Sequence, residues 1–400
     1  MRRVVITGAG TINPLGASVA ATFDAMRAGT CAIGPLDIRD VDRLQVRIGA
    51  QVRDYDEADH FTRQQLTLYD RFTQFALIAG AQAVTQAGLV GVDPDRAGVV
   101  LGTSGGGLNT LDDNYRAVYE DRRDRVHPFI VPRLMANAAA SHLSMTHGLR
   151  GPVTTVSTAC ASSNHAMGQA LATIRGGQAD VMLTGGAEAM LCFGGIKAWE
   201  GLRVMARDTC RPFSADRTGM VQGEGAAVFV FEDRDHALAR GATIMAEVAG
   251  FAATSDAGDI VSPSQDGAAR AMRGAMADAG LTPAQVGYIN AHGTGTAAND
   301  RTECAAVHEV FGEHARDLLI SSTKSMHGHL IGAAGAVELL ACLMALTEGV
   351  IAPTVNHRAA DPDCDLDIVA NTARRAEVSA VLSNAFAFGG LNAVVALTRA

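Results

Sequence analysis

One cysteine stands where nucleophilic chemistry is easiest to support. Cys160 lies in the segment VSTACASSNHAMGQAL, in which a short β-branched run is followed by residues typical of a helix. The N–H groups and dipole at a helix start favour an anion, so this position predicts a lowered pKa for the Cys160 thiol. Its neighbours Ala159, Ala161 and Ser162 are small enough to let a bulky substrate approach. The same pattern also fits a small buried residue without a chemical role, which is our interpretation of Cys342.

Two segments in the second half of the chain carry histidines that could assist such a nucleophile. The first, NAHGTGT, follows a predicted strand and brings His292 to the end of that strand. Thr294 and Thr296 lie in the flexible loop behind it, where their hydroxyls could bind a polar substrate arm. A phosphate-binding loop is the competing interpretation, but the P-loop spacing is absent. A lone histidine at such a position is as often structural as functional.

The second segment, STKSMHGHLIGAAGAVELL, combines two histidines with a lysine and a carboxylate. Lys324, His327 and His329 lie in a turn that enters a long apolar helix, and Glu338 lies within that helix. A carboxylate in such a run is costly unless it is paired, so we predict a contact between Glu338 and Lys324. The alternative is a structural ion pair beside two ordinary histidines.

Other polar and glycine-rich segments give weaker signals. SNAFAFGGLN predicts a turn whose backbone N–H groups could stabilise developing negative charge, although Phe386 and Phe388 fit core residues equally well. Asn299, Asp300 and Glu303 are interpreted as the N-cap and first-turn acids of a helix, with a structural role. The N-terminal GAGTINPLG lacks the third glycine of a dinucleotide-binding fingerprint, so it gives no support for a nucleotide site.

Alternating strands and helices are predicted to position these residues. Short β-branched runs bounded by glycine alternate with long alanine-rich helical patterns, which indicates an α/β fold with buried, largely parallel sheets. The predicted strands are Val4–Thr7, Gly98–Leu101, Val153–Val156, Val181–Thr184, Ala227–Phe231, Tyr288–Asn290, Leu318–Ser321 and Ala393–Leu397. The predicted helices include Phe72–Gly88, Ser162–Arg175 and Gly335–Gly349.

The order of these parts occurs twice, which predicts a duplicated α/β unit. The first copy runs from AGVVLGTS through the Cys160 segment to GMVQGEGAAVFVFE, and the second from VGYINAHGTGT through the Lys324 segment to SNAFAFGGLNAVVALT. We therefore predict two halves, residues 1–250 with the cysteine and residues 251–400 with the two histidines and the lysine. Equivalent strand ends of two such halves can converge on one site.

The composition argues against several other classes of protein. The chain has 400 residues, of which 48% are hydrophobic, and a formal net charge of −9. This charge, without a Lys/Arg-rich tract, argues against nucleic acid binding. Seven scattered cysteines without a CxxC argue against a disulfide framework or a zinc site and favour a reducing cytoplasm.

No integral membrane segment is predicted. The start of the chain, MRRVVITGAG, is interpreted as a first strand rather than a signal peptide. The most apolar run, Leu330–Leu346, contains Glu338 and is predicted to be buried within the protein. A cytoplasmic location follows as the expectation.

Four of these motifs together resemble the β-ketoacyl-acyl-carrier-protein synthases. TACAS around Cys160, NAHGTGT with His292, STKSMHGH with Lys324 and His329, and SNAFAFGG occur in the order of that family, and the likeness spans essentially the whole chain. It is to the elongating Cys-His-His type. NAHGTGTAAND, ISSTKS, EGVIAPTVN and DPDCDLD resemble more particularly the nodulation-associated ketosynthases. The resemblance implies a thiolase-like fold, in which duplicated βαβαβαββ halves form five α-β-α-β-α layers, and a homodimer.

The resemblance also implies a reaction. Cys160 would take an acyl chain from the phosphopantetheine of acyl carrier protein, and a malonyl thioester would then lose carbon dioxide and attack the bound chain. His292 and His329 would assist decarboxylation. The implied activity is that of a 3-oxoacyl-[acyl-carrier-protein] synthase, an acyltransferase of fatty acid or related specialised acyl-chain biosynthesis. No cofactor is implied beyond the carried phosphopantetheine.

Supporting roles are implied for five further residues. The backbone amide of Phe388, together with that of the cysteine, would hold the acyl oxyanion, and the ring would act as a gate. Lys324 with Glu338 would organise the site electrostatically. Thr294 and Thr296 would contact the pantetheine arm.

The acyl tunnel and the gate loop depart from the common pattern of the relatives. Gly105, Ile130 and Trp199 are implied to line the tunnel. Gly105 falls where many long-chain relatives have a bulky aliphatic residue, which predicts a roomier tunnel. Ala387 replaces a glycine and is predicted to stiffen the loop, because glycine permits backbone angles that alanine does not. The role of His327 is left open.

The residues that would dock the carrier protein are uncertain in this sequence, and two other activities are compatible with the same fold. TRQQLTLYD lacks much of the basic cluster that docks carrier protein in relatives, so Arg63, Arg71, Arg203 and Arg207 are the remaining candidates. A catalytically silent partner subunit of the chain-length-factor type would keep the fold and lose the cysteine, which is present here. A degradative thiolase would use a second cysteine near the C-terminal turn, and SNAFAFGG has none.

Overall fold

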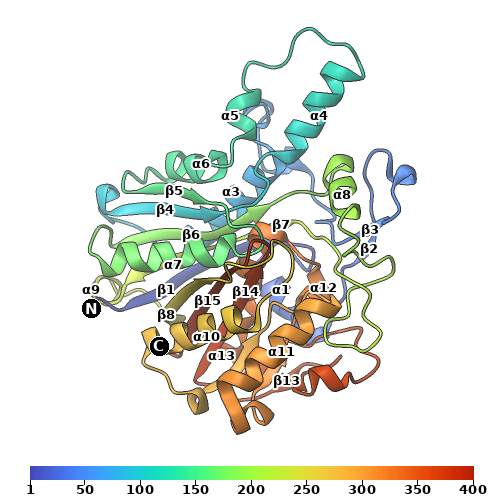
Figure 1. The fold of residues 1–400 in the computed structure, drawn as a ribbon. Coiled ribbons are helices and arrows are strands. Elements are labelled where there is room, and N and C mark those ends of the chain that lie inside the picture. Colours follow the sequence, from blue (N-terminus) through green and yellow to red (C-terminus); the bar gives the residue numbers. More distant parts are fainter.

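The computed structural model describes all residues from Met1 to Ala400, and a long twisted sheet runs through it (Figure 1). Eleven strands follow in the order β12-β10-β9-β14-β15-β8-β1-β7-β6-β4-β5. Their bounds are β1 Val4–Ile12, β4 Ala97–Gly102, β5 Val153–Val156, β6 Val181–Glu188, β7 Gly225–Asp233, β8 Ala246–Ser255, β9 Val286–Asn290, β10 Leu319–Ser321, β12 Asp367–Ile368, β14 Ala380–Ala387 and β15 Leu391–Thr398. Two short ribbons lie outside it, β2 Gly34–Pro35 with β3 Ile48–Gly49, and β11 Val350–Ile351 with β13 Arg374–Arg375.

The sheet is built from two copies of one topology. In the first copy the order is β5-β4-β6-β7-β1, and in the second it is β10-β9-β14-β15-β8. The first two pairings of each copy are parallel and the last two antiparallel. The copies meet where β1 pairs antiparallel with β8. The duplicated βαβαβαββ unit predicted from the sequence is therefore present.

Helices cover the sheet in layers. The helices are α1 Val19–Ala28, α2 Arg63–Leu66, α3 Arg71–Ala87, α4 Leu108–Tyr119, α5 Ile130–Leu134, α6 Ala138–His147, α7 Ser162–Arg175, α8 Phe193–Glu200, α9 Arg234–Ala239, α10 Gln265–Ala279, α11 Ala297–Phe311, α12 Lys324–His327 and α13 Ala334–Glu348. In the first copy α3 covers the outer face, and α10 does the same in the second. The equivalent helices α7 and α13 contact each other and strands of both copies, so they form the middle layer.

The predicted elements are found, and the structure adds others. Each predicted strand and helix corresponds to an observed element, although β1 and β6 extend beyond their predicted ends. The glycines of GAGTI lie inside β1, where a Cβ at Gly8 or Gly10 would come within 2.2 and 2.0 Å of backbone oxygens of α3. These glycines therefore serve close packing. The strand β8 was not predicted, and the boundary expected between residues 250 and 251 falls within it.

The C-terminal segment differs from its prediction. SNAFA was expected in a turn but forms the second part of β14, and only Phe388–Gly390 make the turn. Ser383 and Asn384 break the apolar pattern of this strand, which is held by pairing with β9 on one side and β15 on the other. The pairing with β9 joins segments about ninety residues apart, so the local pattern could not reveal it.

The apolar helix α13 is the centre of the core. Every residue from Ala334 to Leu346 is buried. The run Ile331–Glu348 has the length and composition of a membrane-spanning helix, but 89% of it is buried inside the fold. Its apolar surface therefore packs against other parts of the protein, as we predicted from the presence of Glu338 within the run.

A glycine at the end of β4 sets the position of α7. A Cβ at Gly102 would lie 2.4 Å from the Ser163 nitrogen and 2.5 Å from the Ser162 carbonyl carbon. We expect Gly102→Ala to lower the free energy of unfolding by about 1–3 kcal/mol, because backbone atoms must move apart. Urea denaturation measures this loss. The control is Gly258→Ala, where the nearest atom is 3.8 Å away; equal stability of the two variants would contradict the prediction.

Candidate active site

The nucleophile candidate lies on a sharp turn between β5 and α7. Ala159 takes a positive φ of 49°, a conformation that costs a non-glycine residue energy and is held by its surroundings. Cys160 follows it and is only 5% exposed. The side chain of Ser162 accepts the Thr158 N–H at 2.9 Å and fixes the turn. Cys160 thus points from the first copy of the fold toward the second.

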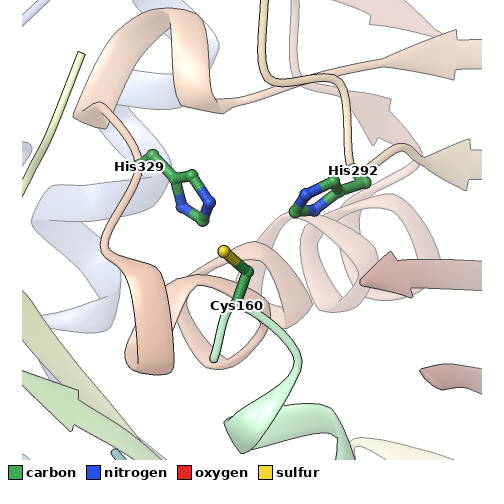
Figure 2. Close-up of side chains that lie close together, drawn as sticks. All are labelled: Cys160, His292 and His329. Atoms are coloured by element: carbon green, nitrogen blue, oxygen red, sulfur yellow. The ribbon is translucent and has the colours of Figure 1, made fainter. Parts of the chain in front are cut away.

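Two histidines from the second copy face the sulfur. His292 follows β9 and His329 lies in the turn before α13, and both are almost fully buried. Figure 2 shows the two rings on opposite sides of the Cys160 sulfur. The sulfur and one ring nitrogen of each histidine lie within 4.8 Å of one another. The equivalent strand ends of the two copies therefore converge on one site.

Hydrogen bonds fix the tautomers of both imidazoles. The Nδ1 atom of His329 accepts the Ile331 N–H at 3.1 Å, so its proton lies on Nε2. The Nδ1 atom of His292 lies 3.4 Å from the ammonium of Lys324, which has only protons to offer. Burial holds the pKa of both histidines well below the usual value, and Lys324 lowers them further. Two neutral rings are thus left with Nε2–H donors for the pocket.

The predicted pair of Lys324 and Glu338 is present. Both side chains are buried, and the ammonium lies 2.5 Å from a carboxylate oxygen. It also donates to the His292 carbonyl oxygen at 2.6 Å. The pair therefore joins α12 and α13 to the loop that carries His292. Burial raises the pKa of the Glu338 carboxyl, and Lys324 opposes that rise.

The pKa predicted for Cys160 was wrong. The sequence predicted a lowered value from the helix start, but burial raises the pKa of this thiol to about 12, even though Lys324 acts in the opposite direction. Desolvation disfavours the thiolate more strongly than the nearby cation favours it. Cys160 is therefore a neutral thiol in this pocket.

The pocket beside Cys160 gathers most of the other predicted residues. Trp199, Thr294, Thr296 and Phe388 line it together with the two histidines. The rings of Phe388 and Trp199 stack with their centroids 5.9 Å apart, which closes one side of the pocket. The backbone N–H groups of Cys160 and Phe388 donate to no backbone carbonyl in this turn region. They are free to bind an oxygen of a substrate.

Two carboxylates that were interpreted as simple helix-start residues support this site. Glu303 accepts the N–H groups of His292 and Gly293 at 2.9 and 2.8 Å, and the amide of Asn384 at 3.0 Å. Asp300 accepts the N–H groups of Gly295 and of the distant Phe213. The N-cap of α11 is Thr296, not Asn299. The sequence signal for this role was the presence of two acidic residues, Asp300 and Glu303, within eleven positions after His292.

His327 takes no part in the pocket. Its Nδ1 atom lies 2.8 Å from the Gly328 carbonyl oxygen, and its Nε2 atom lies 2.9 Å from the Thr323 hydroxyl. Burial lowers the pKa of this ring to about 3, so it is neutral. Both nitrogens are occupied within the turn, which gives His327 a structural position.

Two residues implied to line the acyl tunnel lie outside the pocket of Cys160. Gly105 follows β4, and a Cβ there would meet three side-chain atoms of Met190 at 3.2–3.3 Å. The flexible side chain of Met190 thus lies in the space beside this glycine. Ile130 begins α5, on the lobe formed with α4 that projects from the sheet (Figure 1).

The four arginines proposed for docking differ in their ion pairing and in their exposure to solvent. Arg71 donates to both oxygens of Glu224 at 2.9 and 2.7 Å, so its charge is already paired. Arg203 and Arg207 are exposed and flank Val204, which lines the pocket. Arg63 is exposed on α2. Of the four, only Arg203 and Arg207 lie within three positions of a residue that lines the pocket.

Comparison with known proteins identifies the family. Residues 1–237 match the model of the beta-ketoacyl synthase N-terminal domain, and residues 245–358 match that of the C-terminal domain. The chain belongs to the beta-ketoacyl synthases. Ketoacyl synthases of this kind use no cofactor beyond the phosphopantetheine of the carried substrate, as predicted.

Named relatives cover the whole chain. Nodulation protein E of Rhizobium sp. (strain N33) is 50% identical over 400 residues, spanning 100% of this chain and 99% of the relative. The 3-oxoacyl-[acyl-carrier-protein] synthase 2 of Synechocystis sp. is 39% identical over 408 residues, spanning 100% and 98%. The ishigamide ketosynthase/chain length factor is a solved structure with a TM-score of 0.94 and 36% identity over 100% of this chain and 99% of that one. The predicted thiolase-like ketosynthase fold and the nodulation-type likeness are confirmed.

Removing the buried Lys324 should destabilise the fold much more than removing Lys197, the other lysine of the chain. We expect Lys324→Met to lower the free energy of unfolding by about 3–5 kcal/mol, because Glu338 is left buried without its cation. Urea denaturation measures the loss. Lys197→Met removes the lysine of a partly exposed pair with Glu200 and is expected to cost less than about 1 kcal/mol. Similar losses for the two variants would contradict this account.

Proposed function

We propose that this ketoacyl synthase is a 3-oxoacyl-[acyl-carrier-protein] synthase that condenses a Cys160-bound acyl chain with malonyl-acyl carrier protein. The observation that carries the proposal is the convergence of one thiol and two neutral Nε2–H donors in a single buried pocket. A thiol can carry the acyl chain, and two uncharged donors suit an oxygen that becomes negative during the reaction.

The first half-reaction would transfer the acyl group. The sulfur of Cys160 attacks the carbonyl carbon of the acyl thioester, and the proton of the thiol passes to the pantetheine sulfur that leaves in the same exchange. The carbonyl oxygen becomes negative and is held by the N–H groups of Cys160 and Phe388. When the tetrahedral intermediate collapses, the carbon–sulfur bond to the pantetheine breaks, and the pantetheine leaves as a thiol with the proton. The acyl chain is then bound to Cys160.

The second half-reaction would form the new carbon–carbon bond. The malonyl thioester loses its carboxylate as carbon dioxide, and the electron pair of the broken bond forms an enolate. Its oxygen accepts hydrogen bonds from the Nε2–H groups of His292 and His329. The enolate carbon then attacks the acyl carbonyl on Cys160, the carbon–sulfur bond to the cysteine breaks, and the cysteine sulfur takes up a proton from solvent to become a neutral thiol again. The product is a 3-oxoacyl chain on the carrier protein.

Neutral histidines suit this step because the pocket must not bind the malonyl substrate more tightly than the enolate that forms from it. A fully charged imidazolium would bind the malonyl carboxylate tightly before it leaves, whereas a neutral donor gains most from the oxygen whose charge develops. Burial supplies that neutrality, and Lys324 reinforces it from behind His292. Thr294 and Thr296 line the same pocket and would bind the polar pantetheine arm.

A catalytically silent subunit is the second candidate. It is favoured by one comparison, because the similar ishigamide protein is named as a ketosynthase/chain length factor. Against it stands the presence of the cysteine, both histidines and the lysine in contact with one another. The acylation experiment below separates the two candidates.

The partners we propose are acyl carrier protein and a second copy of this chain. Arg203 and Arg207 beside the pocket suit an acidic carrier protein. The edge strand β5 and the α4–α5 lobe leave apolar residues exposed, among them Val131 at 62% and Phe129 at 48%. In a homodimer formed through this face, Ile130 of one protomer could line the acyl tunnel of its partner. The location we propose is the cytoplasm.

Acylation tests the nucleophile. Incubation with acyl-acyl carrier protein should add the mass of the acyl group to the peptide that contains Cys160, because only this thiol faces the pocket with two histidines. Intact-protein and peptide mass spectrometry measure the modification. Cys192→Ala is the matched control, since Cys192 is also buried but lies outside the pocket, and it should be acylated normally. Acylation of Cys160→Ala, or none of the wild type, would refute the assignment.

Gly105→Ile tests the predicted tunnel. A branched side chain there would have to displace Met190, so we expect the longest accepted acyl chain to become shorter. Product lengths are measured by mass spectrometry with a panel of acyl-acyl carrier proteins. Unchanged lengths would show that the chain does not pass Gly105. The same panel on the wild type decides between a housekeeping fatty acid and a specialised acyl product.

A further inference from the structure

A buried carboxylate outside the pocket joins two loops of the site. Glu188 ends β6 and is fully buried. One of its oxygens accepts the Thr103 hydroxyl and the Gly105 N–H, both at 3.1 Å. The other accepts the N–H groups of Ser104 at 2.7 Å and Gly332 at 3.1 Å. Thus four donors, three from the loop after β4 and one from the turn before α13, meet on one side chain.

The bond to Gly332 fixes the residue that orients His329. The preceding residue, Ile331, has a φ of 48°, which is unusual for a β-branched residue and costs of the order of 1–3 kcal/mol. Its N–H is the group that holds Nδ1 of His329. The backbone of His329 itself is held by Val221 and Gly223. The strained turn after it depends on Glu188.

We propose that Glu188 is a positioning residue for His329. By accepting the Gly332 N–H, it holds the Ile331 turn in place, so that the Ile331 N–H keeps the proton of His329 on Nε2, directed at Cys160. This inference rests on the proposed function, in which that Nε2–H donates to the enolate oxygen.

A carboxylate suits this place better than any neutral side chain. All four partners are donors, and an ionised carboxylate accepts only. Burial raises the pKa of the Glu188 carboxyl to about 7, and the four donors oppose the rise. A glutamine offers one accepting oxygen and turns an NH₂ group toward the remaining donors. In either orientation it keeps only two of the four bonds and turns its NH₂ group toward the other two donors.

The two half-reactions distinguish positioning from general support. Acyl transfer uses the N–H groups of Cys160 and Phe388, which do not contact Glu188. Condensation uses the His329 donor. For Glu188→Gln we expect condensation to fall about 10- to 100-fold, the scale of a small misplacement of a catalytic group. Acylation of Cys160 should stay close to the wild-type rate. His329→Ala is the benchmark and should give the same split.

The matched control is a buried carboxylate at the far end of the same strand pairing. Glu232 lies on β7 opposite Val181, whereas Glu188 lies opposite Gly225. It is fully buried and bonds to Thr7, His236 and Arg240. Glu232→Gln is expected to leave the ratio of the two half-reactions unchanged at a temperature below unfolding. A shift of that ratio by Glu232→Gln would show that any lost buried carboxylate has this effect, and would overturn the proposal.

The remaining outcomes each decide one point. Equal loss of both half-reactions in Glu188→Gln, or an unchanged condensation rate, would overturn the positioning role. If this variant does not fold, Glu188→Asp replaces it, since it keeps the charge but cannot reach both loops; the same split is expected and an unchanged ratio overturns the proposal. A wild type that is acylated but forms no 3-oxoacyl product would refute the proposed function instead.

Discussion

The burial of one ion pair sets the conditions for the whole site. Lys324 and Glu338 lie in the core with no access to water, so each is tolerable only in the presence of the other. The ammonium group of Lys324 also donates to the carbonyl oxygen of His292 and lies beside the Nδ1 atom of that ring. A charge placed behind the pocket thus keeps His292 neutral and oriented, while the three side chains that meet at the Cys160 sulfur are uncharged.

The duplicated topology explains why these groups meet. In each copy a helix follows the third strand, α7 after β5 and α13 after β10, and the two helices lie side by side between the copies. Their starts interlock, because the Ser163 hydroxyl on α7 accepts the N–H of Ala336 on α13. The nucleophile precedes one helix and His329 precedes the other. Neither copy forms the site alone, so the site depends on the same interface that buries the core.

The sequence predicted what local patterns encode. Cys160, His292, Lys324 and the duplicated α/β topology follow from motifs and periodicity within short windows, and the resemblance to a family ordered them. What it missed depends on contacts between distant segments. The strand β14 pairs with the distant strand β9, and Glu188 is 144 positions from the Gly332 N–H that it accepts. The pKa of Cys160 was wrong for the same reason, since burial is a property of the folded chain.

That raised pKa changes how the nucleophile should be understood. A thiolate at rest in a buried pocket would be costly and would react with any electrophile that entered. A neutral thiol between two neutral imidazoles stores no such charge. In the proposed reaction its reactivity would arise when a thioester carbonyl accepts hydrogen bonds from the N–H groups of Cys160 and Phe388, because the negative charge then forms on an oxygen that these donors stabilise. In that proposed reaction, burial would protect the Cys160 thiol and tie its activation to a bound thioester.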